Sequence, residues 1–408
     1  MQNVEAAGLG IGDDYPPRIM GVLNVSEESP YDPSVFSDPG DAARYVDERL
    51  IDEGADIVDV GLESANKRFD VLPPDEELLR LETAVETIES VSGDAVFSIE
   101  TRYHEVAEAA LDAGFDMVND IAGFADPQMP RVCEEYDVAV GKMASPPDLE
   151  RPGAVEETDW AERRSPAWAA NADYVDMVYA ALEQNGLTDK TIVDPAFGGW
   201  SEATTIDDDR ETFRRLREFR GHGRPILVSI NRKNFLRSVA DRSTEAALPV
   251  SLAATSMAVE RGAHVIRTHD VAETRDAALI GREFARERLD DGEAAVEELD
   301  VTGAGEVARH LDRLGGATER APEATVRIFE VSDLDPADER ALAAATGDGI
   351  GYVRGSDGGL LFGSDAAFEN GRVPRDATDR AAAILRRVRR WVGEKKTSSS
   401  ASSTVNGS

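Results

Sequence analysis

The sequence has 408 residues with a formal net charge of −36, and arginine supplies nearly all of its positive charge. This length accommodates one large domain and a smaller one. So acidic a chain argues against nucleic acid and anionic membranes as partners, because both need a basic face.

Lysine is rare in the sequence, and arginine greatly outnumbers it. It occurs at only six positions: Lys67, Lys142, Lys190, Lys233, Lys395 and Lys396. An acidic, lysine-poor surface suits a protein that works in concentrated salt, where screening relaxes the repulsion between like charges. We therefore interpret the sequence as halophilic, with an ordinary acidic cytosolic protein as the alternative.

The sequence also indicates where the protein is located and which metal sites it lacks. Residues 1–17 have no long apolar core, and no run of about 18 apolar residues occurs, so we expect neither a signal peptide nor a membrane span, and a cytoplasmic protein. Cys133 is alone, which excludes an intramolecular disulfide and a cysteine-based zinc site. The histidines show no metal-ligand spacing such as HExxH; they are His104, His222, His264, His269 and His310.

Short apolar runs alternate with amphipathic stretches up to about residue 290. The runs predict strands over residues 19–25, 56–60, 95–99, 116–119, 138–143, 191–193, 225–229 and 264–268. The stretches predict helices over residues 41–53, 75–91, 104–113, 127–135, about 167–185, 208–220, 249–261 and 274–288. Glycines that follow helices support these bounds, as a glycine just past a helix end does; they are Gly54, Gly114, Gly186 and Gly262.

Eight such strand–helix units are the pattern of an α/β fold closed into a (β/α)8 TIM barrel. A doubly wound open sheet is the alternative. We expect the barrel over residues 18–290, after an N-terminal extension of residues 1–17.

A small α+β domain of open role is expected over residues 296–394, after an acidic linker at 289–300. The sequence predicts its helices near 306–314, 337–345 and 377–392, and its strands at 325–331, 351–354 and 359–362. The Ser-rich tail, residues 395–408, is expected to be disordered.

The predicted barrel strands end in polar residues, and in such barrels the carboxyl ends of the strands build the active site. Carboxylate and amide edges on Glu100, Asn119 and Asp194 suit a flat heterocycle that carries ring N–H, amino and carbonyl groups. Lys233 could reach a carbonyl or nitrogen of such a ring. Structural alternatives remain, since Asp194 could hold a turn and Glu100 could cap the next helix.

A second group of strand-end residues suits an anion. Arginine matches the geometry of phosphate, so Arg267, His269 and Arg232 predict a phosphate site, and the amide oxygen of Asn24 could share a metal ion with it. A turn and a solvated loop are the structural alternatives for Asn24 and Arg232. We expect the remaining strand-end cations to form ion pairs instead of touching a substrate; they are Arg102 and Lys142.

Nine short motifs in register resemble dihydropteroate synthase over roughly residues 18–285, and the chain is similar to a divergent, halophilic archaeal-type member of that pterin-binding family. The motifs are Met20-Gly-Val-Leu-Asn-Val25, Glu53-Gly-Ala-Asp-Ile-Val-Asp-Val60, Gly61-Leu-Glu-Ser64, Ser98-Ile-Glu-Thr101, Ala110-Leu-Asp-Ala-Gly114, Val118-Asn-Asp-Ile121, Asp194-Pro195, Asn231-Arg-Lys233 and Arg267-Thr-His-Asp270. The resemblance implies a barrel that joins 6-hydroxymethyl-7,8-dihydropterin diphosphate to 4-aminobenzoate in folate biosynthesis, releasing pyrophosphate with Mg²⁺ as cofactor. It also implies a homodimer.

The resemblance assigns roles to the matching positions. Lys233, Arg267 and His269 are the implied catalytic residues. The family mechanism has an SN1-like character, in which the C–O bond to diphosphate loosens before the aniline nitrogen attacks. The binding roles are Mg²⁺–diphosphate for Asn24, diphosphate for Arg267 and His269, and pterin for Glu100, Asn119, Asp194 and Lys233.

The sequence departs from the family at several places. Glu100 stands where the family usually has aspartate, Asn231 replaces a serine, and Lys142-Met143 replaces Met-His. The loop Gly61-Leu-Glu-Ser-Ala-Asn-Lys67 replaces Gly-Gly-Glu-Ser-Thr-Arg-Pro, so the threonine and arginine that touch diphosphate and aminobenzoate are missing. Lys67 or Arg68 is a candidate substitute. The second-substrate half of the site therefore departs further, and a related arylamine acceptor stays open.

Two other functions remain as alternatives. One is a pterin-dependent methyltransferase domain, which shares the barrel and pterin pocket but needs no anion site. The other is a barrel that binds pterin without chemistry, which the altered loop after the second strand suggests.

Overall fold

The computed structural model describes residues 1–25, 34–63, 71–149, 153–198, 203–291, 296–344, 349–356, 358–373 and 377–398. Ser64, Lys67, Arg68 and the tail from residue 399 onwards lie outside these ranges, so the expectations about them stay predictions. The chain divides into two compact units, Met1–Glu287 and Arg288–Ser408, and each is described by itself.

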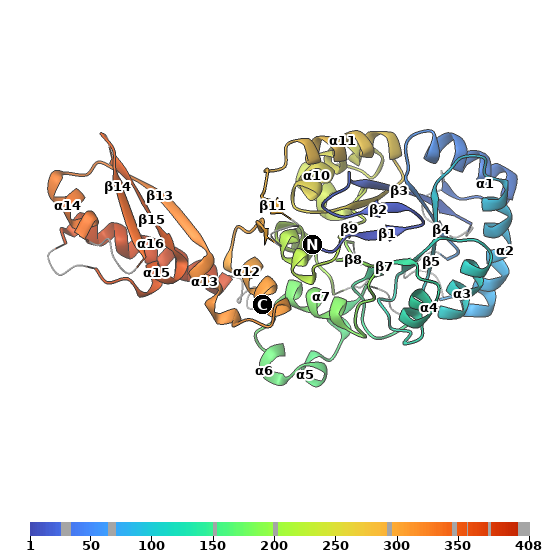
Figure 1. Ribbon diagram of the computed structural model, residues 1–408, viewed down its shortest axis with the longest axis horizontal. Helices are drawn as coiled ribbons and strands as arrows, with labels where there is room; N and C mark the ends of the chain where they lie inside the picture. Colours follow the sequence, from blue (N-terminus) through green and yellow to red (C-terminus); the bar gives the residue numbers. More distant parts are fainter. Residues whose placement is uncertain are drawn as a thin grey trace. The chain divides into compact units, whose positions relative to one another are not determined.

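Eight parallel strands build the first unit (Figure 1). Their hydrogen-bonded order is β8-β7-β6-β5-β4-β3-β10-β9, and a parallel bridge from Val193 to Ile226 joins β8 to the start of β9. The two ends of the sheet therefore meet, which confirms the TIM barrel and excludes the open doubly wound sheet. The strands are β3 (Arg18–Asn24), β4 (Ile57–Gly61), β5 (Val96–Thr101), β6 (Met117–Asp120), β7 (Ala139–Met143), β8 (Thr191–Asp194), β9 (Leu227–Val228) and β10 (Val265–Thr268).

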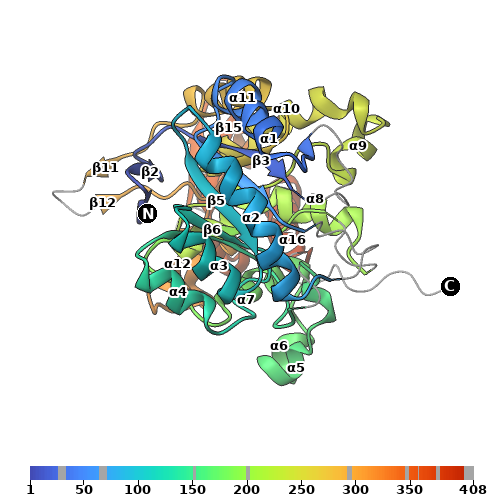
Figure 2. The ribbon, with the colours of Figure 1, turned by 90° about the vertical axis from the view of Figure 1, so that its right-hand side faces the viewer.

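Helices surround these strands, as Figures 1 and 2 show. A π-helical turn, Val46–Ile51, continues the first helix, and a 3-10 helix, Leu216–His222, continues α8. Short 3-10 helices also occur at Val155–Glu157 and Glu245–Ala247. The α-helices are α1 (Pro39–Tyr45), α2 (Pro74–Ser90), α3 (His104–Asp112), α4 (Met129–Glu135), α5 (Trp160–Arg163), α6 (Pro166–Ala169), α7 (Tyr174–Glu183), α8 (Ile206–Arg214), α9 (Asn234–Ala240), α10 (Leu248–Glu260) and α11 (Val271–Glu283).

The single helix predicted over residues 167–185 is wrong, because the structure breaks it between α6 and α7. Asp173 accepts a hydrogen bond from the Asp176 N–H, and the Asp176 side chain accepts one from the Asp173 N–H. This reciprocal capping box starts α7 afresh at Tyr174.

Alternate residues of each strand face the barrel interior, because side chains along a strand point to opposite faces. One apolar residue from every strand joins a buried floor, made by Met20, Ile57, Val96, Met117, Ala139, Ile192, Leu227 and Val265. Two residues further along four of the same strands stand charged or amide side chains: Asp59, Asn119, Asp194 and Arg267. The barrel thus has an apolar floor and a polar mouth at the carboxyl ends of its strands.

The N-terminal residues complete that floor. An antiparallel hairpin of β1 (Val4–Ala6) and β2 (Leu9–Ile11) buries Val4, Ala6 and Ile11 against the floor residues. Residues 1–17, expected as an extension ahead of the barrel, therefore contribute to its core.

A buried ion cluster fastens this segment. Arg220 donates to both carboxylate oxygens of Asp13, at 3.1 and 2.8 Å, and His264 Nε2 lies 3.2 Å from Asp13 Oδ1. The Ile226 N–H donates to His264 Nδ1, which leaves Nε2 as the nitrogen that donates to Asp13. Burial alone would raise the pKa of Asp13, but the hydrogen bonds from His264 and Arg220 hold it below its usual range.

Replacing Asp13 by asparagine should lower the free energy of unfolding by about 3 kcal/mol, because Arg220 is only 4% exposed and would lose its counter-charge. A carboxylate with a lowered pKa stabilises the fold above its unfolded-state pKa of about 3.9 and loses this effect as the pH falls. The gap between wild type and Asp13→Asn in urea unfolding should therefore be constant above about pH 5 and shrink below it. A gap that grows on acidification would contradict this assignment.

The second unit is a small α+β fold. Its antiparallel sheet has the order β13-β15-β14, and Val331 and Leu361 on one face of this sheet are buried in a core that includes Phe368 of a helix. A short antiparallel pair, β11 (Asp290–Asp291) with β12 (Val296–Glu297), occupies part of the stretch expected as a linker. The remaining elements are α12 (Ala304–Arg313), a 3-10 helix (Thr318–Arg320), α13 (Ala321–Ala324), β13 (Val326–Ser332), α14 (Pro336–Ala344), β14 (Ile350–Arg354), β15 (Gly358–Ser364), α15 (Asp365–Asn370) and α16 (Asp379–Ser398).

The last helix corrects one expectation about the tail. Because α16 continues to Ser398, residues 395–398 are helical, and the disorder predicted from Lys395 does not begin there. Among the described residues, no helix combines the length and the apolarity needed to cross a membrane.

Candidate active site

Arg267 is the centre of the polar barrel mouth. Its Nε donates to Asp59 Oδ2 at 2.7 Å and its Nη2 donates to Glu100 Oε2 at 2.5 Å, so two neighbouring strands each present a carboxylate to one guanidinium. These carboxylates raise the pKa of Arg267 although burial opposes them, so the arginine stays charged. Burial in turn raises the pKa of Glu100, while Arg267 lowers it.

Asp59 links this arginine to the amide at the next strand end. Asn119 Nδ2 donates to the same oxygen, Asp59 Oδ2, at 2.9 Å, and Asp59 is completely buried. The sequence analysis missed Asp59. The sequence feature that could have identified Asp59 is a carboxylate inside the otherwise apolar strand β4. It lies two residues from Ile57 and two from Gly61, so it points to the same inward face as they do.

Asp194 and Lys233 complete the predicted heterocycle site. Burial raises the pKa of Asp194 to about 6. The Ala196 N–H, which donates to Asp194 Oδ1 at 2.8 Å, and the nearby charges of Lys233 and Arg267 act to lower this pKa. Burial and the charge of Arg267 lower the pKa of Lys233, while Asp209 and Asp194 raise it. Asp209 was also missed; its Oδ1 accepts the Gly198 N–H at 3.2 Å.

The structure thus brings Asp194, Lys233 and Arg267 together in one barrel mouth. The charges of Lys233 and Arg267 both lower the pKa of Asp194, and the charge of Arg267 lowers the pKa of Lys233. A Cβ atom on Gly198 would lie 2.8 Å from Lys233 Nζ, and the φ of +107° at Gly198 also favours glycine. The backbone of the loop after β8 therefore lies directly against the lysine.

Arg232 and His269 lie beside this group. Arg232 donates through Nε and Nη2 to the two oxygens of Asp270, both at 2.8 Å, and through Nη1 to the carbonyls of Thr244 and Glu245. Burial and the charge of Arg267 lower the pKa of His269 to about 3, so its imidazole is neutral at pH 7. His269 can therefore donate a hydrogen bond to an anion, but it brings no positive charge.

Asn24 reaches the mouth from β3. Its Nδ2 donates to Ser34 Oγ at 3.1 Å, which fixes the amide plane of a side chain that is 7% exposed. A Cβ atom on Gly61 would lie 2.9 Å from Asn24 Oδ1 and 3.6 Å from Glu100 Oε1. The glycine therefore leaves room where the Asn24 amide and the Glu100 carboxylate come close.

Gly141 on β7 has the same relation to Asn119, because a Cβ atom there would lie 2.9 Å from Asn119 Oδ1. We expect Gly141→Ala to displace this amide and raise the KM for a heterocyclic substrate about tenfold, because the substrate would lose about one hydrogen bond to the protein. Gly393→Ala is the matched control, since a Cβ atom at Gly393 meets nothing within 4 Å. Steady-state kinetics that show equal KM values for Gly141→Ala and wild type would contradict the proximity argument.

Arg102 forms an ion pair, as the sequence predicted. It is 1% exposed, its Nη2 donates to Glu63 Oε2 at 2.7 Å, and its Nη1 donates to the carbonyl of Leu149. Glu63 also accepts the Leu72 N–H at 3.1 Å. Glu63 therefore links the Arg102 guanidinium to the backbone that precedes α2.

Lys142 does not lie in the mouth. Its Nζ donates to the backbone carbonyls of Gln184 and Gly186, at 2.5 and 2.8 Å, and lies 4.4 Å from the centre of the Phe124 ring. Burial lowers the pKa of Lys142 to about 7. The predicted ion pair is therefore wrong. Lys142 instead caps backbone carbonyls just after α7, as lysines near a helix C-terminus can do.

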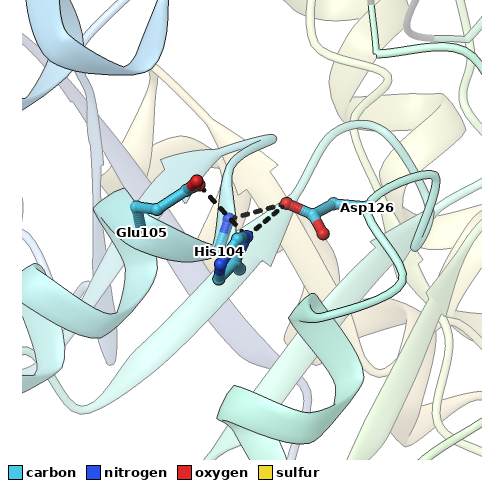
Figure 3. A group of neighbouring side chains, drawn as sticks. All are labelled: His104, Glu105 and Asp126. Carbon is cyan, nitrogen blue, oxygen red and sulfur yellow. Dashed lines mark hydrogen bonds and ion pairs between the residues drawn. The ribbon is translucent and has the colours of Figure 1, made fainter.

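Three further potential ligands gather at the start of α3 (Figure 3). His104 Nδ1 lies 2.7 Å from Asp126 Oδ2 and 3.1 Å from Glu105 Oε2. The same Asp126 accepts the His104 N–H through Oδ2 and the Gln128 N–H through Oδ1. These hydrogen bonds give the cluster a structural role, since they connect the loop before α4 to the first turn of α3.

Comparison with known proteins places the barrel in a family. Residues 20–269 match the family described as pterin binding enzyme. The chain is 34% identical over 280 residues to a probable bifunctional folylpolyglutamate synthase/dihydropteroate synthase of Haloferax volcanii, which covers 66% of this chain. It spans only 31% of that relative's length.

Single-activity relatives match over most of their length. A dihydropteroate synthase of Bacillus subtilis is 30% identical over 260 residues, covering 62% of this chain and 83% of the relative. The structure of the Coxiella burnetii dihydropteroate synthase in complex with pteroic acid is 27% identical, with a TM-score of 0.54 over 69% of this chain and 98% of that one. The chain belongs to the pterin-binding enzyme family.

Proposed function

We propose that this chain is a dihydropteroate synthase, which condenses 6-hydroxymethyl-7,8-dihydropterin diphosphate with 4-aminobenzoate or a related arylamine in folate biosynthesis. One observation carries the proposal: the acidic and amide groups that suit a pterin and the arginine that suits a diphosphate meet in a single barrel mouth. Similarity to dihydropteroate synthases over the same barrel supports it.

The pterin half consists of Glu100, Asn119, Asp194 and Lys233. Carboxylate and amide oxygens accept from the amino and ring N–H groups of a pterin, and the ammonium of Lys233 donates to its carbonyl or ring nitrogen. Because Asp194 is 5% exposed and Asn119 is 4% exposed, these hydrogen bonds would form away from water and orient the ring.

The diphosphate half consists of Arg267 and His269. The guanidinium offers a fixed charge and forked donors, and the neutral imidazole adds an N–H donor. Arg232, expected here as well, directs its fork to Asp270. We infer that Arg232 positions the loop that carries Lys233.

The residues present also fit a magnesium ion. Asn24 offers a fixed amide oxygen beside Glu100, and Mg²⁺ takes few protein ligands when it also binds substrate phosphates. Asn24 would hold the ion against the diphosphate, where the metal would neutralise part of the leaving group's charge. We therefore keep Mg²⁺ as the proposed cofactor.

In the reaction, the bond between the pterin methylene carbon and the diphosphate oxygen breaks, and the aniline nitrogen forms a bond to the same carbon. Pyrophosphate leaves with the electron pair, and the nitrogen then loses a proton to solvent. Arg267 and His269 stabilise the charge that develops on the departing oxygen. The pterin half holds the methylene carbon in place as the bond loosens.

Two sequence-based expectations remain part of the proposal. The first is a cytoplasmic location, and the second is a homodimer. Sedimentation equilibrium in molar KCl would test the homodimer. The measured molecular mass should be twice the chain mass of 44.1 kDa.

The test is turnover of dihydropterin diphosphate and 4-aminobenzoate by purified protein with Mg²⁺ in molar KCl. The proposal predicts equimolar pyrophosphate and dihydropteroate, detected by mass spectrometry. Pterin binding without turnover would favour a non-catalytic barrel. Methyl transfer from a reduced pterin would favour the methyltransferase alternative, against which the Arg267 site counts.

A further inference from the structure

We propose that Glu100 couples the two halves of the substrate site. Before substrate binds, the Glu100 carboxylate forms an ion pair with Arg267 in the place of a diphosphate. When the pterin ring binds, Glu100 turns to the ring and Arg267 becomes available to the diphosphate. This inference rests on the proposed function and deepens it. It names the residue through which recognition of the pterin ring controls recognition of the diphosphate.

Glu100 is the carboxylate on Arg267 that can move. Asp59 is completely buried and also accepts from Asn119, so two hydrogen bonds hold it. The Glu100 side chain is 11% exposed and stands one residue before the end of β5, at the rim of the mouth. Its Oε2 lies 2.5 Å from Arg267 Nη2, so the pair forms a charge-assisted hydrogen bond.

This pair depends on the length of the glutamate side chain. An aspartate on the same backbone would end one C–C bond earlier, about 1.5 Å short. Its carboxylate would then lie about 4 Å from Nη2, beyond hydrogen-bond distance. The glutamate at this position, where the family usually has aspartate, therefore creates a contact that the shorter residue would not make.

A diphosphate and the Glu100 carboxylate compete for the same Arg267 donors, because both present pairs of anionic oxygens that match the N–H groups of a guanidinium. Displaced Glu100 would remain beside the carboxylates of Asp59 and Glu63, which both act to raise its pKa. A partly buried carboxylate without a partner is unfavourable, but the amino and ring N–H groups of a pterin provide one. Ring binding therefore makes release of Arg267 easier.

The two ligands should accordingly bind with positive coupling, and the coupling should be reciprocal, as linkage requires. In calorimetry at fixed molar KCl, 6-hydroxymethylpterin should tighten the Kd of wild type for pyrophosphate by about tenfold. Glu100→Gln should bind pyrophosphate tightly without the ring, and the ring should change its Kd by less than about twofold. Glu100→Asp should match Glu100→Gln for pyrophosphate alone, because it withdraws the carboxylate and keeps the charge.

Glu108→Gln is the control, since Glu108 is exposed on α3 and its substitution removes one negative charge from the same part of the barrel. It should retain the coupling of wild type. Equal behaviour of Glu108→Gln and Glu100→Gln would overturn the proposal in favour of a general charge effect. Wild-type binding of both ligands without coupling would overturn it while the proposed function stands, whereas failure of wild type to bind either ligand would reject both.

Discussion

Lys233→Ala should lower kcat/KM for dihydropterin diphosphate by about 10²–10³-fold, the loss expected for one preorganised donor in a water-poor site. Burial and the charge of Arg267 lower the pKa of this lysine, while Asp209 and Asp194 act in the opposite direction, so Lys233 belongs to the buried charges of the mouth. The backbone at Gly198 also lies against its side chain. Its removal should therefore leave both a missing donor and a gap beside the ring.

Steady-state kinetics would test this expectation, with Lys190→Ala as the matched control. Lys190 forms an ion pair at 3.0 Å with Asp137, whose side chain is 84% exposed, so its loss should change kcat/KM less than twofold. Circular dichroism should show that both variants are folded. Equal kinetics for Lys233→Ala and wild type would remove the lysine from the site.

Arg267→Ala should have the largest effect in the chain, on both stability and rate. The substitution leaves the carboxylates of Asp59 and Glu100 without their shared counter-charge, one of them fully buried. Removing one partner of a buried ion pair lowers the free energy of unfolding by about 3–5 kcal/mol. It also deprives the leaving diphosphate of its fixed positive charge, so the rate should fall by at least about 10³-fold.

Arg267→Lys separates these two effects. It keeps a positive charge between the carboxylates and should recover part of the stability, but a single ammonium cannot reproduce the fork, so the rate should stay low. Arg44→Ala is the control, because Arg44 is 63% exposed in a helix-surface pair with Asp41. Urea unfolding and kinetics together test this prediction, which fails if Arg267→Ala unfolds at the wild-type midpoint.

The order of elements and the strand-end residues could be predicted because both follow from local patterns. Apolar runs and helical periodicity located all eight barrel strands, and the rule that barrel sites form at the carboxyl ends of strands selected Asn119, Asp194 and Arg267. The number of strand–helix units predicted a closed barrel, but no local pattern reveals the bridge between Val193 and Ile226 that joins the two ends of the sheet.

Other features depended on partners distant in the sequence. The N-terminal hairpin has strands of three residues, too short to show a period, and its burial follows from the barrel floor beneath it. From the sequence, Arg102→Ala is expected to cost little of the rate. The 1% exposure of Arg102 and its pairing with Glu63, which only the structure reveals, mean that the substitution should lower stability. The place of Asp59 in the network likewise required knowing which strands are neighbours.

The most direct measurement is a crystal structure of the protein with dihydropterin diphosphate bound. We expect the pterin ring to lie against Asn119, Asp194 and Lys233 and the diphosphate to lie against Arg267 and His269. The Glu100 carboxylate should have turned from Arg267 to the ring. A ligand bound away from the strand ends of the barrel, or a diphosphate that points away from Arg267, would contradict it.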